Sequence, residues 1–399
     1  MPASAGRVAA RRGEASSEAA SDETRFPRQG ARDAGQDLPR QALARESMQR
    51  AWKRVKANKG AAGVDGLDIA RTGQHLKHAW PTIRQQLMEG TYRPLPVRRV
   101  RIPKPDGSER ALGIPTVTDR LIQQALLQVL QPLIDPAFSE HSHGFRPGRR
   151  ARDAVLAAQQ YAQEGFRGVV AERAEGTPQG GPLSPLLANV LLDEVDRELE
   201  RRGHRFTRYA DDCNVYVRSR KAGERVMALL KRRYDRLHLK INESKSAVTG
   251  AFGRKFLGFG LYRAPKGEVK RAVSKKALAT FRQRIRQLTR RSGGRSISEV
   301  IDKLRSYVLG WKAYYGLAQT PRVLLRLDEW MRHRMRAIHL KRWRHGTTIY
   351  RELMRLGAKP KVALLVSKNS RRWWRNSAMA LNNVLTIAYF DRLGMPRLT

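Results

Sequence analysis

Two adjacent aspartates between two strand-like runs constrain the fold of this chain more than any other feature. Residues 204–208 have the composition of a strand, and after Asp212 valines alternate with polar residues as far as Val217. Because successive side chains of a strand point to opposite faces, Asp211 and Asp212 can serve one site only where the backbone turns. The pattern therefore predicts a β-hairpin with an acidic tip.

An acidic hairpin tip has two interpretations. Carboxylate oxygens suit Mg²⁺, and two such ions roughly 3.5 to 4 Å apart can activate an attacking hydroxyl and stabilise a leaving pyrophosphate. Taken alone, an Asp-Asp pair is more often a polar surface turn, because Asp is a common turn former. The choice depends on the rest of the sequence.

The charge balance favours a polyanionic partner. The 399 residues include 79 Lys and Arg against 36 Asp and Glu, which gives a net charge of +43. Such a charge opposes compaction unless a polyanion shares the surface, so nucleic acid is the expected partner. A membrane surface is the weaker alternative, because no run of 18 or more apolar residues occurs. The single cysteine, Cys213, excludes a disulfide framework and suits a reducing cytoplasm.

Four motifs, in this order and spacing, resemble the group II intron reverse transcriptase/maturase family. They are Gly176–Leu186 (Gly-Thr-Pro-Gln-Gly-Gly-Pro-Leu-Ser-Pro-Leu), Tyr209–Asp212 (Tyr-Ala-Asp-Asp), Leu239–Lys245 and Phe256–Phe259. The resemblance implies an RNA-directed DNA polymerase, a nucleotidyltransferase that uses Mg²⁺ and dNTPs. It also implies binding to group II intron RNA and to a DNA target or primer, in the bacterial cytoplasm close to the nucleoid.

The resemblance implies an α/β (α+β) fold with fingers and a palm around a small antiparallel sheet, followed by a helical thumb. Residues 1–42 contain almost no large apolar side chains, which predicts a disordered tail. The remaining divisions are fingers and start of the palm at 43–170, palm at 171–262, thumb or maturase-specific domain at 263–345, and a C-terminal DNA-binding region at 346–399.

The resemblance also assigns residues to catalysis and nucleotide binding. Asp211 and Asp212 are the implied metal ligands, and Lys245 either protonates the leaving pyrophosphate or simply contacts a phosphate. In residues 97–114 apolar side chains alternate with basic ones, which predicts a basic hairpin. Taken alone, the pattern fits a solvated edge strand equally well. Family positions that border the incoming nucleotide are matched by Lys104, Arg110, Gln179 and Gly180.

Other matched positions concern the primer and the template. The segment Phe256, Leu257 and Gly258 resembles the part of the family that positions the primer end. Candidate contacts to RNA or DNA are Arg146, Arg149, Arg282 and Arg286.

Helical periodicity supplies further expectations. We expect helices near 75–88 and 121–130, the second stopped by Pro132. A helix that starts at Ser184 is expected to turn Leu187, Val190, Leu191, Val195 and Leu199 inward. Its acidic residues are expected to be solvated, namely Asp193, Glu194, Asp196, Glu198 and Glu200.

One carboxylate that the resemblance requires is missing. In the family it lies on a strand just after a Val-Val pair, but here Val169-Val170 runs directly into Ala171. The nearby carboxylates without that strand context are Asp153, Glu164, Glu172 and Glu175. We therefore expect the partner strand of the acidic hairpin to be absent and polymerase activity to be impaired.

Two functions remain open at this point. One is an RNA-templated DNA polymerase that also assists intron splicing and mobility. The other is a catalytically inactive RNA-binding splicing cofactor, or the product of a degenerate gene.

Overall fold

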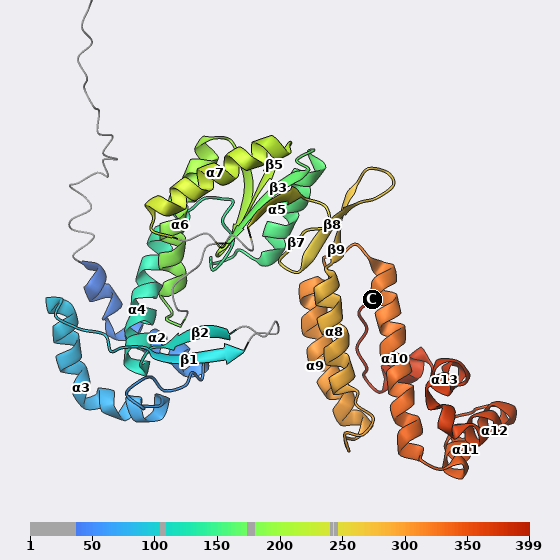
Figure 1. Ribbon diagram of the computed structural model, residues 1–399. Coiled ribbons are helices and arrows are strands. Elements are labelled where there is room, and N and C mark those ends of the chain that lie inside the picture. The colour runs from blue at the N-terminus through green and yellow to red at the C-terminus, as the bar shows by residue number, and fades with distance from the viewer. Residues whose placement is uncertain (1–36, 104–108, 174–179, 240–241, 243–245) are drawn as a thin grey trace, which may run out of the picture. The chain divides into compact units, whose positions relative to one another are not determined.

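The computed structural model describes residues 37–103, 109–173, 180–239, 242 and 246–399 (Figure 1). Helices alternate with small antiparallel sheets, and helices alone follow after Val273, which confirms the predicted α/β fold with a helical C-terminal region. The chain divides into two compact units. The first holds the described residues up to Pro96 together with Thr116–Leu130, and the second holds Val97–Pro115 with Gln131–Thr399.

The first unit is helical. Its elements are α2 (Arg45–Ala57), α3 (Ile69–Glu89) and the larger part of α4 (Val117–Ile134). Ala51, Leu121 and Ala125 are buried at its centre, with Trp52 and Leu76 packed against them.

Three boundaries in this region differ from those predicted. Residues 37–42 are helical and Ala42 is fully buried, so the predicted tail extends too far. Helix α3 begins earlier because the Asp68 carboxylate accepts a hydrogen bond from the Arg71 amide at 2.8 Å, which caps the helix. Helix α4 continues two residues past Pro132, since a proline within the last turn ends a helix without preventing that turn.

The second unit starts with the predicted basic hairpin. Strands β1 (Arg98–Pro103) and β2 (Glu109–Ile114) pair antiparallel, with Arg98 opposite Ile114. Three arginines of β1 are exposed, so the hairpin presents cations to solvent.

The region predicted to be the palm contains a four-stranded sheet in the order β4-β5-β3-β6, and we keep the name palm for it. Its strands are β3 (Gly168–Arg173), β4 (Arg205–Tyr209), β5 (Asp212–Val217) and β6 (Ala247–Gly250). Strand β3 pairs antiparallel with β5 on one side and with β6 on the other. The expectation of a missing partner strand is therefore wrong: β5 is an interior strand, and Val215 and Val217 are buried.

Helices cover both faces of this sheet (Figure 1). Helices α6 (Ser184–Arg201) and α7 (Arg220–Arg236) pack on the face that carries Val170, Val215 and Val217. Helix α5 (Ala151–Gln163) packs on the opposite face against Val169 and Tyr216. The valines after the acidic turn thus alternate with Tyr216 as predicted.

The inward face of α6 differs from the prediction. Leu187, Val190 and Leu191 are 53%, 43% and 41% exposed, whereas Val195 and Leu199 are buried as expected. Three acidic residues of the same helix, Asp193, Asp196 and Glu198, are buried instead.

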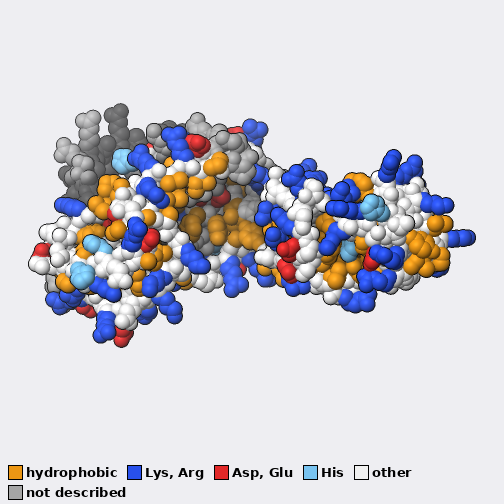
Figure 2. Space-filling model, turned by 90° about the horizontal axis from the view of Figure 1, so that it is seen from below, with side chains coloured by type: hydrophobic (Ala, Val, Ile, Leu, Met, Phe, Trp, Pro, Cys, Tyr) orange, Lys and Arg blue, Asp and Glu red, His pale blue; other side chains and the backbone are white. Residues whose placement is uncertain are grey.

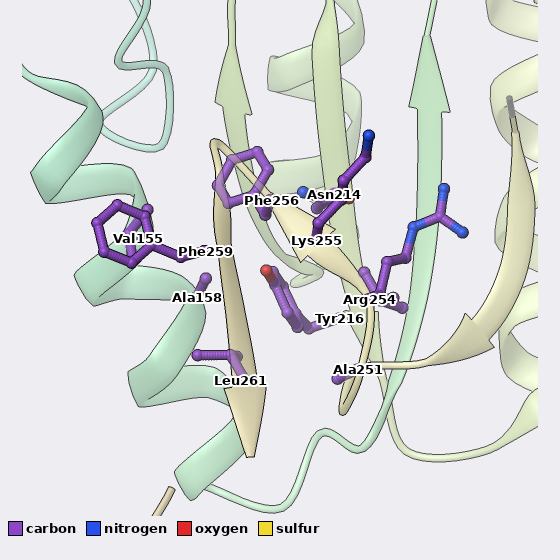
Figure 3. Close-up of a pocket in the computed structure, with 11 residues that line it drawn as sticks. Val155, Ala158, Asn214, Tyr216, Ala251, Arg254, Lys255, Phe256, Phe259 and Leu261 are labelled. Carbon is purple, nitrogen blue, oxygen red and sulfur yellow. The ribbon is translucent and has the colours of Figure 1, made fainter. Parts of the chain in front are cut away.

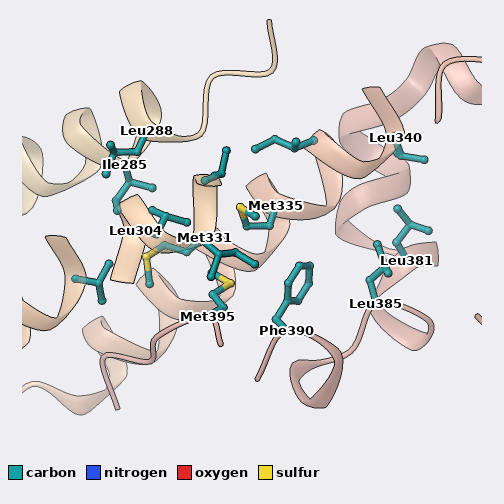
Figure 4. Packing of buried hydrophobic residues seen from close by; sticks show 14 of the residues in the cluster. Ile285, Leu288, Leu304, Met331, Met335, Leu340, Leu381, Leu385, Phe390 and Met395 are labelled. Carbon is teal, nitrogen blue, oxygen red and sulfur yellow. The ribbon is translucent and has the colours of Figure 1, made fainter. Parts of the chain in front are cut away.

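A three-stranded sheet leads into the helical region. Its strands are β7 (Lys255–Phe256), β8 (Phe259–Arg263) and β9 (Val269–Val273). The helices that follow are α8 (Lys275–Leu288), α9 (Ile297–Tyr315), α10 (Pro321–Trp343), α11 (Gly346–Arg355), α12 (Pro360–Lys368), α13 (Trp373–Ala378) and α14 (Ile387–Arg392). Their common core includes Ile285, Leu304, Met331 and Phe390 (Figure 4). No described helix is both long enough and apolar enough to cross a membrane.

His339 lies in this helical core and makes its stability depend on pH. Its Nε2 atom has no hydrogen-bond partner among the described residues, and burial, with the nearby charge of Arg342, lowers its pKa to about 4. The unfolded chain therefore binds a proton between about pH 6.5 and 4 that the folded chain does not, and stability is lost as the pH falls through that window. We expect the helical region to lose about 2 to 3 kcal/mol of unfolding free energy between pH 7 and 4.5 on this account.

The measurement is urea unfolding followed by tryptophan fluorescence at both pH values. His339→Phe should remove most of the difference in stability between the two pH values, because an aromatic ring still fills the space and no titrating nitrogen is left. An unchanged pH dependence in that variant would contradict the assignment.

Candidate functional site: the acidic turn of the palm

The predicted acidic hairpin is present. Strands β4 and β5 pair with Tyr209 opposite Asp212, and Ala210 and Asp211 form the turn between them. Ala210 has a φ of +56°, a left-handed conformation that a residue with a Cβ adopts only at a cost. The surrounding structure must hold this turn in place.

Gly144 lies directly against the turn. A Cβ at this position would be 2.2 Å from the Ala210 backbone nitrogen and 2.9 Å from the Tyr209 carbonyl carbon. Only glycine allows this approach of one backbone to another. The carbonyl oxygen of Gly144 accepts a hydrogen bond of 2.9 Å from the Asn189 side-chain amide on α6.

A buried ion pair supports the turn from the same side. Arg208, 1% exposed, donates from Nε and Nη2 to both carboxylate oxygens of Asp196, which is fully buried. The distances lie between 2.5 and 2.9 Å. Burial lowers the pKa of Arg208, but the charge of Asp196 and the hydrogen bonds to it together raise the pKa above its ordinary value, so the guanidinium stays charged.

Arg208 joins these parts into one assembly. Its Nη1 atom donates to Asn189 Oδ1 at 2.8 Å and to the carbonyl oxygen of Ala210 at 3.2 Å. We call Gly144, Asn189, Asp196 and Arg208 the turn support. The prediction that Asp196 is solvated is wrong, because its buried partner is this arginine beside the turn.

Two other acidic residues of α6 are also buried in ion pairs. Asp193 pairs with Arg197 at 2.6 Å and accepts from the Ser139 amide. Glu198 accepts from three arginines, Arg201, Arg202 and Arg233, which together lower its pKa to about 2. Solvation was therefore the wrong expectation for these two residues as well.

The turn support yields a stability prediction. Arg208→Met leaves Asp196 as an uncompensated buried charge, so we expect a loss of roughly 3 to 5 kcal/mol in the unfolding free energy of the palm. Hydrogen exchange of β4 and β5 across a urea series measures it. The double variant Arg208→Met/Asp196→Leu should recover much of the loss, since no charge is left unpaired. A loss below about 1 kcal/mol in the single variant would contradict the role.

Strand β3 determines which residue lies across from the acidic turn. In the antiparallel pairing with β5, Glu172 lies opposite Cys213 and Arg173 lies opposite Asp212. Glu172 therefore belongs to a strand, contrary to the sequence prediction. Directly opposed residues share a face of a sheet, so the β3 position on the face of Asp212 is held by Arg173.

The described residues do not complete a metal site. Asp211 and Asp212 offer two carboxylates, and within the described part of the chain no group of three or more His, Cys, Asp or Glu is placed to hold a metal ion. A pair of Mg²⁺ ions needs more oxygen ligands than two residues supply. The predicted Mg²⁺ site therefore fits this structure incompletely.

Arg254 is a residue near the acidic turn that sequence reasoning missed. Burial lowers its pKa, and the negative charge of Asp212 partly offsets that effect. It borders a small cavity between β5 and the β7–β8 hairpin, where Tyr216, Phe256 and Phe259 converge (Figure 3). The cavity measures about 20 Å³, room for about one water, so it is a packing seam.

The predicted primer-positioning residues form a tight turn. Leu257 and Gly258 have φ values of +49° and +82° between the paired residues Phe256 and Phe259. The hydroxyl of Tyr314 on α9 donates to the Leu257 carbonyl oxygen at 3.0 Å. The turn is thereby fixed to α9.

The predicted nucleotide-binding residues are only partly described. Lys104, Gln179 and Lys245 lie outside the described residues. Arg110 is paired in β2 opposite Ile102. A Cβ at Gly180 would lie 1.5 Å from the Gly113 carbonyl oxygen, so the structure brings the end of the Gly-rich motif against the basic hairpin.

The arginines predicted to contact RNA or DNA differ in environment. Arg146 is buried and donates to Asp135 and to the carbonyl oxygens of Ser139 and Ser142, so it has a structural role within the protein, and its contact with RNA or DNA stays a prediction. Arg149 pairs with Glu140 at 2.5 Å. Arg282 and Arg286 are exposed on α8, and their role stays a prediction. The face seen in Figure 2 carries many Lys and Arg side chains and few acidic ones.

Comparisons with known proteins match two regions. The family model "Reverse transcriptase (RNA-dependent DNA polymerase)" matches residues 165–261, and "Group II intron, maturase-specific domain" matches residues 278–357. Protein YkfC of Escherichia coli (strain K12) is 30% identical over 199 residues, which cover 37% of this chain and 52% of that protein. Group II intron-encoded protein LtrA of Lactococcus lactis subsp. cremoris is 32% identical over 194 residues, and the match covers 37% of this chain and 32% of that protein.

The chain thus spans about half, or less, of the length of these curated relatives. Among solved structures, a "Partial Cas6-RT-Cas1--Cas2 complex" matches 50% of this chain and 42% of that chain at 20% identity. Its TM-score of 0.30 is too low to add to the argument.

Proposed function

Because the chain belongs to the group II intron reverse transcriptase/maturase family, we propose that it binds structured group II intron RNA and assists splicing, and that its own DNA polymerase activity is feeble or lost. Its nucleic-acid partners are the intron RNA and a DNA target or primer, and dNTPs with Mg²⁺ are the substrates and cofactor of any residual polymerase. We place it in the bacterial cytoplasm, near the nucleoid.

The observation that carries the proposal is the pairing of Arg173 with Asp212. A polymerase site of this family type needs a carboxylate on the strand beside the acidic turn, and the position that faces Asp212 holds a basic residue instead. Loss of one group that stabilises developing charge costs roughly 10²-fold or more in rate.

A further observation supports the proposal. RNA binding needs no metal site, and a net charge of +43 favours it.

One observation favours the polymerase interpretation. The turn support holds Ala210 in its strained conformation and keeps Asp211 and Asp212 at the end of the sheet. The acidic turn is therefore formed even though the residues that the structure describes do not complete its carboxylate set.

One preparation can test both parts. Equilibrium binding to a group II intron RNA should be tight at low salt, and primer extension on an RNA template should stay near background while an active relative extends the same primer. Robust extension that disappears in Asp211→Asn would overturn the second part, because a further carboxylate would then complete the site. Absence of RNA binding would overturn the first.

A further inference from the structure

An arginine-lined hollow opens at the end of the palm sheet away from the acidic turn. Its volume is about 580 Å³. We call it the arginine hollow. The cations that line it are Arg202, Arg205, Arg218, Arg225 and Arg232. None of the described residues that line it is Asp or Glu.

The hollow is separate from the acidic turn. Arg205 begins β4 and Arg218 follows the end of β5, whereas the turn joins the other ends of the same two strands. Five residues of strand separate the two places by about 15 Å. A ligand in the hollow therefore need not touch Asp211 or Asp212.

The five cations are unequally neutralised within the protein. Arg202 pairs with Glu198 at 2.6 Å, Arg205 approaches Glu164 only to 4.0 Å, and Arg218 lies 5.1 Å from the centre of the Phe166 ring. Arg225 and Arg232 are exposed and form no ion pair with any residue that the structure describes. Like charges gathered in one hollow repel each other unless an anion enters it.

The shape of the hollow strengthens this effect. Val217, Ala222, Val226 and Leu229 contribute apolar side chains to the lining. Apolar walls keep the local dielectric constant low, so the field of the cations is focused where a ligand would enter. The smaller cavity beside Phe256, with about 20 Å³, offers no comparable space.

We propose that the arginine hollow binds the phosphate backbone of an RNA strand. Arg225 and Arg232 are seven residues apart on α7, which places them about 10 Å apart along the helix axis. A row of cations of this length matches a chain of phosphates better than one isolated phosphate. The inference rests on the proposed RNA binding and adds a site for it outside the acidic turn.

A matched pair of double variants tests the site. Arg225→Gln/Arg232→Gln removes the two arginines without ion-pair partners, and Arg220→Gln/Arg236→Gln removes the same charge from the same helix outside the hollow. All four residues are exposed, so both variants should fold. The probe is a structured group II intron RNA, with affinity measured by filter binding from about 50 to 200 mM salt.

The first variant should reduce the slope of log affinity against log salt by about 1.4 to 1.8 and weaken binding about 10- to 50-fold at ~100 mM salt. The control should change the slope by less than about 0.5. Equal losses in both variants, or none in either, would overturn the site while leaving RNA binding itself intact. If the wild-type chain binds no RNA, the proposed function fails instead.

Photocrosslinking supplies a second readout. Benzoylphenylalanine in place of Ala228, which lines the hollow, should crosslink the RNA, and the same group in place of Lys221 should not. Phosphatidylserine vesicles provide the remaining comparison. Vesicle binding that is lost in Arg225→Gln/Arg232→Gln, with RNA binding unchanged, would assign the hollow to a membrane surface and overturn the inference.

Discussion

Affinity of the purified chain for structured RNA should fall by about 10³-fold or more when salt is raised from about 50 to 200 mM, as expected for a protein that neutralises at least six phosphates. The reason is counterion release: each phosphate neutralised by Lys or Arg frees condensed cations, and added salt opposes that release. The 79 basic residues are spread along the chain, and the basic hairpin, α7, α8 and the later helices all carry some of them, so many phosphates can be reached at once.

Filter binding with a group II intron RNA measures this dependence. Arg101→Gln, which removes one exposed arginine of β1, should lower the slope by about one contact, whereas Arg146→Gln should act mainly through stability because Arg146 is buried. A flat salt response would contradict electrostatic RNA binding.

Arg173→Asp should tighten the binding of Mn²⁺ at the acidic turn by at least about 10-fold. Its backbone position faces Asp212 across the β3–β5 pair, so the substitution adds a carboxylate on the face of the sheet that Asp212 shares. Hard divalent cations gain affinity with each added oxygen ligand.

Electron paramagnetic resonance of free Mn²⁺ in a titration measures the affinity. Arg173→Asn is the matched control, because it removes the positive charge without adding a carboxylate, and it should account for only part of the gain. Asp211→Asn in the Arg173→Asp background should abolish the gain. If Arg173→Asp and Arg173→Asn bind Mn²⁺ equally, the register argument for the missing ligand is wrong. Primer extension in Arg173→Asp should rise above the wild-type background if that ligand is the main defect.

Local sequence patterns were sufficient to predict elements whose hydrogen-bond partners lie nearby in the chain. The acidic hairpin followed from valine alternation around two turn-forming aspartates. The start of α9 is set in the same local way by Ser296 and Glu299, which form a reciprocal capping box with hydrogen bonds of 3.1 and 2.7 Å. These signals are local because the hydrogen bonds that they describe join residues a few positions apart.

Burial of charge could not be predicted in that way. Asp196 and Leu187 lie on one helix, and hydropathy alone places the leucine inside and the aspartate outside. The reverse holds because Arg208, on a strand beyond the end of that helix, brings a buried guanidinium to Asp196. A sequence pattern ranks residues by their own solvation, whereas a buried ion pair depends on a partner that only the fold supplies.

The sequence by itself determined the family, the acidic turn and the basic character of this chain, because ordered motifs, a hairpin pattern and net charge are properties of the residues alone. Only the tertiary structure decided that β3 pairs with β5 and sets Arg173 opposite Asp212, that Gly144, Asn189, Asp196 and Arg208 hold the turn, and that five arginines meet around one hollow. Each of these depends on contacts between segments that are distant in the chain, and such contacts are set by the register and packing of whole strands and helices.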